Sequence, residues 1–65
     1  MTTTITVDGM SCEHCEQTVE NALRSVSGVT DASADRTAER ASIDGDDEVT
    51  ALIAAVEDAG YTAHP

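Results

Sequence analysis

Residues 2–26, TTTITVDGMSCEHCEQTVENALRSV, carry the signals that decide the fold: a strand, a short break and a helix. Residues 2–7 are β-branched throughout and place alternate side chains on one face, which predicts a half-buried strand with Thr3, Ile5 and Val7 inside. The segment Asp-Gly-Met-Ser at 8–11 then breaks the alternation. From about Glu13 to Val26 apolar residues recur at helical spacing, which predicts an amphipathic helix that stops at Ser27-Gly28.

The rest of the chain predicts a hairpin, a second helix and a final strand. Residues 29–44 show two weak alternations on either side of the polar segment 35–39, which indicate a hairpin. A second amphipathic helix follows Asp46-Asp47-Glu48, whose charges suit a helix N-terminus, and ends at Gly60. Residues 61–64 fit a short edge strand. The order β-α-β-β-α-β is the ferredoxin-like βαββαβ arrangement, an α+β sandwich with two helices on one face of a four-stranded antiparallel sheet.

Size and charge limit what the chain can do. With 65 residues it has room for one domain, residues 1–65, and one small core. Thirteen Asp and Glu against three Arg and no Lys give a net charge of -10, which excludes nucleic acid as a partner. No segment is apolar enough for membrane insertion and no secretory signal is present, so we expect a cytoplasmic location. Because the chain starts at Met1 and has no trailing linker, we expect a free-standing protein.

The composition also predicts adaptation to high salt. Carboxylates are dense, Lys is absent, and ten Ala stand among the apolar residues, with no Phe or Trp. The plainer alternative is an acidic soluble domain that avoids aggregation by self-repulsion. A disordered acidic chain is a third possibility, but the strong periodicity argues against it.

Cys12-Glu13-His14-Cys15 is the only group of residues in the sequence that indicates a functional site. Its two thiols are three positions apart at the start of the first predicted helix, where exposed N–H groups favour the thiolate. Two ligands from one chain do not complete a tetrahedral zinc site, whereas soft thiolates in a low-coordinate site select Cu(I). The pattern therefore predicts a soft-metal site at Cys12 and Cys15.

Two other interpretations of the pair remain open. A redox C-x-x-C of thioredoxin type also places its thiols at a helix N-terminus. Its fold needs more strands than this chain supplies, and Pro65 cannot build the cis-proline loop of that fold. In the second alternative, the cysteines have no role beyond packing.

The string Gly9-Met10-Ser11-Cys12-Glu13-His14-Cys15, followed by a helix and later by Asp58-Ala59-Gly60-Tyr61, resembles the heavy-metal-associated (HMA) domain of copper chaperones and copper-transporting P-type ATPases. The resemblance covers the whole chain. It implies a ferredoxin-like fold and a metal-binding copper chaperone, not an enzyme, that holds Cu(I) through Cys12 and Cys15. It also implies metal transport by thiolate exchange to the metal-binding domain of such an ATPase, and a copper-bridged homodimer is a further possibility. Relatives for mercury and for zinc or cadmium share the fold, but Ser11 offers no carboxylate to a harder ion.

Four other residues receive weaker predictions. We expect Met10 to anchor the loop in the core, as in the family that the sequence resembles. His14 is expected to be a solvated residue that tunes the thiolates. Tyr61 matches a tyrosine beside the metal loop of bacterial-type chaperones, with simple packing as an equal alternative. His64 is expected to be frayed. Eukaryotic-type chaperones dock through lysines on an acidic target, and this chain has no Lys. If the protein works in molar salt, long-range steering is screened, and recognition is expected to rest on short-range contacts around Met10, Cys15 and Tyr61 and on the shared metal.

Overall fold

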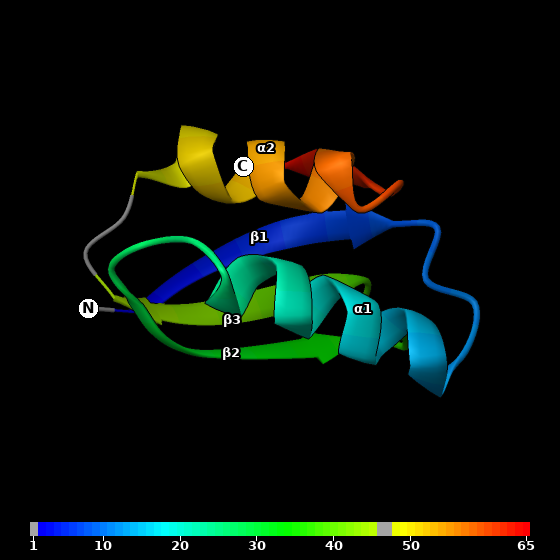
Figure 1. The fold of residues 1–65 in the computed structure, drawn as a ribbon. Coiled ribbons are helices and arrows are strands. Elements are labelled where there is room, and N and C mark those ends of the chain that lie inside the picture. Colours follow the sequence, from blue (N-terminus) through cyan, green and yellow to red (C-terminus); the bar gives the residue numbers. More distant parts are fainter. Residues whose placement is uncertain (1, 46–47) are drawn as a thin grey trace.

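The sheet has its strands in the order β2-β3-β1-β4, and every neighbouring pair is antiparallel. The computed structural model describes residues 2–45 and 48–65. Its elements follow in the order β1 (Thr2–Asp8), α1 (Glu13–Arg24), β2 (Val29–Asp35), β3 (Arg40–Gly45), α2 (Val49–Asp58) and β4 (Thr62–His64). Both helices cover the same face of the sheet (Figure 1). The predicted ferredoxin-like βαββαβ sandwich is therefore confirmed.

β1 lies inside the sheet, between β3 and β4, because its alternating side chains give it one apolar face. Ile5 and Val7 are buried under the helices, and Ile5 pairs with Ala41 of β3. The core contains no aromatic residue and consists of small and aliphatic side chains: Ile5, Val7, Val19, Leu23, Ala32, Ala41, Ile43, Leu52, Val56 and Ala63. A core of this kind buries little area per residue, which leaves a small domain with a modest hydrophobic stabilisation.

α1 ends at Arg24, two residues before the predicted limit at Val26. The Ser25 amide donates to Asn21 O at 3.1 Å, and the Val26 amide donates to Leu23 O at 3.1 Å, so the last turn tightens into 3₁₀-type bonding. Val26 nevertheless packs against the core. Apolar periodicity therefore indicates which residues face the core, but not where the helical hydrogen bonding stops.

Side chains of α1 reach the outer edge of β2, which is an edge strand of the sheet. One carboxylate accepts from a backbone amide of β2, a second accepts from the amide of the residue that follows β2, and a guanidinium donates to a β2 carbonyl. The bonds run from Ala34 N to Glu20 Oε2 (2.9 Å), from Arg36 N to Glu16 Oε2 (2.6 Å) and from the Arg24 guanidinium to Ala32 O (2.9 Å). Backbone groups without a strand partner are satisfied in this way.

α2 begins after Glu48, whose side chain makes no capping hydrogen bond. The predicted role of Asp46 and Asp47 at this helix start lies outside the described residues. Within residues 2–45 and 48–65, neither helix has the length and apolar character needed to cross a membrane. β4 is an edge strand, as predicted, but the expectation that His64 is frayed is wrong. His64 belongs to β4 and pairs with Thr6 of β1.

Candidate metal centre

Cys12 and Cys15 lie at the exposed N-terminus of α1, with their Sγ atoms 3.6 Å apart. Cys12 is the N-cap residue, in extended conformation, and its carbonyl accepts from the amides of Cys15 and Glu16 at 3.0 and 3.3 Å. One helical turn therefore brings the two sulfurs to the same side. Cys12 is exposed, Cys15 is half-buried, and both are free thiols.

Hydrogen bonds from its neighbours lower the pKa of Cys15 from 9.0 to about 6. The largest contribution comes from the Tyr61 hydroxyl, followed by the backbone and the hydroxyl of Ser11 and by the Cys12 thiol, whereas partial burial opposes them. The Ser11 Oγ atom is 3.7 Å from Cys15 Sγ. Each of these donors favours the charged form of the sulfur, so a pKa of about 6 favours the thiolate form of Cys15 at pH 7. Bonding to the same thiolate raises the pKa of the Tyr61 phenol.

The turn at the C-terminus of α2 places Tyr61 beside Cys15. The Gly60 amide donates to Glu57 O at 3.0 Å and the Tyr61 amide donates to Val56 O at 3.3 Å, which together form a Schellman motif. Gly60 adopts a φ of +99°, which a residue with a Cβ rarely takes, and so reverses the chain after the helix. Tyr61 also packs against the core, so the phenol serves both of the roles considered from the sequence.

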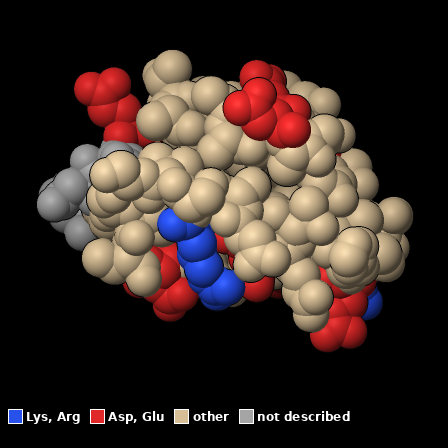
Figure 2. Space-filling view, in the orientation of Figure 1, with Lys and Arg blue, Asp and Glu red and all other residues tan. Residues whose placement is uncertain are grey.

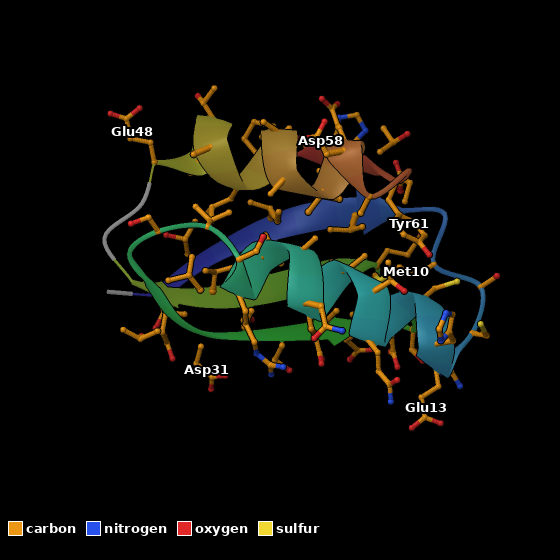
Figure 3. All side chains as sticks on the ribbon, in the orientation of Figure 1. Met10, Glu13, Asp31, Glu48, Asp58 and Tyr61 are labelled. Atoms are coloured by element: carbon orange, nitrogen blue, oxygen red, sulfur yellow. The ribbon has the colours of Figure 1, made fainter. Side chains whose placement is uncertain are left out.

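The loop between β1 and α1 is held from both sides. Gly9 has a φ of +97°, and a Cβ at this position would lie 3.5 Å from Tyr61 Cδ1, so the loop backbone passes close to the phenol ring. Met10 is partly buried and packs against the core, which confirms its predicted anchoring role. His14 is exposed, as expected for a solvated residue. Figure 3 shows Met10 and Tyr61 close together at the end of the molecule where α1 begins.

Among the described residues, no set of three or more His, Cys, Asp or Glu is arranged to hold a metal ion. His64 lies on the neighbouring strand, where its Nε2 atom is 3.2 Å from Asp8 Oδ2. With a metal–sulfur bond of about 2.3 Å, as in zinc thiolates, two sulfurs at the observed separation can both contact one ion. Within the described residues, the pair of sulfurs is therefore the candidate donor set.

The Heavy-metal-associated domain family matches residues 4–62. The chain belongs to the heavy-metal-associated domain family. Among curated proteins, it is 42% identical over 60 residues to the copper chaperone CopZ of Staphylococcus haemolyticus, with 88% of each chain covered. The family is thus shown by sequence alone, and the observed fold agrees with it.

Solved structures of the same family superpose closely on the chain. A CopZ metallochaperone shares 35% identity at a TM-score of 0.92, covering 97% of this chain and 98% of the other. A copper-binding domain from HMA7, a P-type ATPase, shares 33% identity at a TM-score of 0.93, covering 97% and 89%. Free-standing chaperones and ATPase domains of the family therefore resemble this chain about equally.

Proposed function

We propose that residues 1–65 form a single heavy-metal-associated domain that acts as a cytoplasmic copper chaperone and binds one Cu(I) ion through Cys12 and Cys15. The observation that carries this proposal is the pair of sulfurs 3.6 Å apart at the start of α1, and the lowered pKa of Cys15 supports it. Thiolate is the form of cysteine that binds metal. Similarity to proteins named copper chaperones supports the choice of metal.

The donor set favours a soft monovalent ion. Two thiolates suit Cu(I), whereas a structural zinc site takes four ligands. Ser11 precedes the first cysteine and supplies a hydroxyl to Cys15 Sγ, so this position offers no carboxylate to a harder ion. Mercury, zinc and cadmium are the competing ions.

The exposure of Cys12 allows a second protein to reach the ion. In the proposed transfer, each Cu–S bond that breaks is replaced by a bond to a thiolate of the acceptor, and copper remains monovalent throughout. The acceptor is a like-folded metal-binding domain of a copper-transporting P-type ATPase, and similarity to the HMA7 domain supports this choice. A copper-bridged homodimer is the same intermediate formed with a second copy.

Titration of the reduced protein with Cu(I) against a competing chelator tests the proposal. We expect one ion per chain, with sulfur as the only first-shell donor in X-ray absorption, and loss of the site in Cys12→Ala and in Cys15→Ala. His14→Ala is the matched control and is expected to change the affinity without removing the site. Nitrogen or oxygen in the first shell of the monomer would contradict sulfur-only binding, and equal loss of binding in His14→Ala would make histidine a ligand.

Thiol–disulfide exchange is the second candidate function, because the same sulfur separation and lowered pKa suit a redox dithiol. An oxidoreductase would reduce insulin disulfides with turnover in the presence of dithiothreitol. We expect no turnover above the rate with dithiothreitol alone. Sustained turnover that is lost in Cys12→Ala would replace the chaperone assignment with an enzymatic one.

A further inference from the structure

The dipeptide Asp-Gly occurs twice in the chain, at Asp8-Gly9 and at Asp44-Gly45. Acidic side chains are distributed over several parts of the surface (Figure 2), but only a following glycine leaves the backbone nitrogen unshielded by a Cβ, so that it can attack the aspartate carboxyl group. The backbone requires both glycines: Gly9 has a φ of +97°, and a Cβ on Gly45 would overlap the carbonyl oxygen of Gly28. The fold therefore retains two peptides of the same chemical reactivity, and their surroundings decide which of them reacts.

Asp8 is the last residue of β1, and its backbone is paired on one side only. Its partner is Thr62 of β4, whereas the register between β1 and β3 ends at Thr6. Gly9 is exposed and lies outside the strands, and among residues 2–45 and 48–65 its amide donates to no backbone carbonyl. The Asp8 carboxylate contacts His64 Nε2 at 3.2 Å, but both side chains are about half exposed, and exposed pairs of this kind are weak. The carboxyl group and the Gly9 nitrogen are therefore free to approach each other.

Asp44-Gly45 is held inside the sheet. Asp44 pairs in register with Thr2 of β1 on one side and with Asp31 of β2 on the other, and its Oδ1 atom accepts a 2.7 Å hydrogen bond from Thr2 Oγ1. Gly45 belongs to the same strand and pairs with Val29. Ring closure at this peptide requires β3 to separate from both of its neighbours, whereas ring closure at Asp8 requires only the end of β1 to open.

We propose that Asp8-Gly9 is a site of spontaneous isomerisation to isoaspartate through a succinimide, and that the sheet protects Asp44-Gly45. The Gly9 nitrogen forms a bond to Asp8 Cγ, and the carboxyl group loses its hydroxyl, which leaves as water with the amide proton. Water then opens the ring. Cleavage of the bond between the nitrogen and Cγ restores aspartate, whereas cleavage of the bond between the nitrogen and the main-chain carbonyl carbon gives isoaspartate. The atomic composition is unchanged, and the reaction needs no oxidant.

Isoaspartate at this position changes the start of the metal loop. The backbone then runs through the former side chain and is longer by one carbon atom, or about 1.5 Å of bond length. The added atom directly precedes Gly9, which lies close to the Tyr61 ring, and Met10, which packs against the core. Because the Tyr61 hydroxyl is the largest of the groups that lower the pKa of Cys15, isomerisation should raise that pKa. Reaction at one peptide bond is therefore expected to weaken the thiolate without oxidising it.

Ageing of the reduced protein tests the proposal, at neutral pH, physiological temperature and an ionic strength at which circular dichroism shows it folded. Cleavage after glutamate places the two peptides in separate fragments, residues 1–13 and 40–48, and electron-transfer fragmentation distinguishes isoaspartate from aspartate in each. We expect isoaspartate to form at Asp8 about tenfold or more faster than at Asp44 in the folded protein. In denaturant the two rates should be similar. Equal rates in the folded protein, or a difference that persists in denaturant, would overturn the proposal.

Asp8→Glu and Asp44→Glu are the matched variants. Each keeps the net charge of -10, and the extra methylene of glutamate disfavours ring closure. Asp8→Glu should lose the product from fragment 1–13, whereas Asp44→Glu should retain it.

The effect on the site is read in the isoaspartate form, after its chromatographic separation from the aged wild-type protein. Alkylation of its Cys15 should shift to higher pH than in fresh protein. An unchanged profile would show that the loop absorbs the added atom and would refute the expected effect. Both readouts need no metal, so a failure of Cu(I) binding would refute the proposed function and not this inference.

Discussion

Replacing Tyr61 with Phe should raise the pKa of Cys15, because the phenol is the largest of the groups that lower it. The pKa of this thiol falls from 9.0 to about 6, and four hydrogen bonds contribute, of which the bond from Tyr61 is the largest. Loss of this largest contribution should raise the pKa of Cys15 above about 6, so at pH 6 less than about half of Cys15 should be thiolate in the variant.

The rate of Cys15 alkylation by iodoacetamide across pH, read by peptide mass spectrometry, measures this pKa separately from that of Cys12. Phe keeps the ring that packs against the core, so the fold should be retained. Ser11→Ala is the control: loss of its hydroxyl, a smaller contributor, should raise the pKa of Cys15 by less than loss of the phenol. An unchanged pKa in Tyr61→Phe, or a larger change in Ser11→Ala, would refute the assigned order of hydrogen bonds.

The pH dependence of the Cu(I) affinity follows from the same pKa of Cys15. Copper binds the thiolate, so a proton on Cys15 competes with the metal only when the pH falls through about 6. The apparent Cu(I) affinity of the wild type should lose about tenfold per pH unit below that point from this group, and in Tyr61→Phe the same loss should begin at higher pH. Chelator competition at several pH values measures both curves.

Three further outcomes are expected. Gly60→Ala should destabilise the fold by about 1–2 kcal/mol in thermal unfolding, because φ is +99° there, and should also raise the pKa of Cys15 by displacing Tyr61. If the pH dependence of Cys15 alkylation were unchanged in this variant, the turn at Gly60 would not be what positions Tyr61 beside Cys15. Glu39 has a φ of 56°, so Glu39→Gly should gain roughly 0.5–1 kcal/mol in denaturant unfolding, whereas Glu39→Ala should not. Circular dichroism of the apo protein should show folded signal that rises with salt, and Cu(I) should restore structure in dilute buffer, by up to about 4 kcal/mol at a thousandfold excess over Kd. An apo protein equally helical and heat-resistant from dilute buffer to molar salt would refute the predicted adaptation to high salt.

The sequence predicts the parts of the molecule that depend on local pattern. The strand at Ile5 and Val7, the helix with Val19 and Leu23 inside, and the position of the cysteine pair between them all follow from periodicity over a few residues. The resulting element order was enough to identify the fold.

The sequence alone does not predict features that depend on contacts between residues far apart in the chain. Tyr61 is remote in sequence from Cys15, so its hydroxyl was recognised only as a match to a family position and not as the main donor to the thiolate. The Asp8–His64 pair depends on the register of β1 and β4, which periodicity in a three-residue strand does not fix. The end of α1 at Arg24 depends on a change of hydrogen-bonding partner that leaves no mark on the apolar pattern.

The bonds from α1 to the outer edge of β2 have a consequence for self-association. A strand with free amides and carbonyls at the sheet edge is a template on which another chain can pair, and concentrated proteins aggregate through such edges. Here Glu20 and Arg24 bond to backbone groups of β2, and Glu16 bonds to the Arg36 amide just after it, so an incoming strand would have to displace charged side chains. Replacing these three residues with Ala would expose the edge while leaving both helices and the cysteines in the sequence. We therefore expect these side chains to hinder edge-to-edge pairing between folded molecules, and a redesign that neutralises them to make such pairing easier.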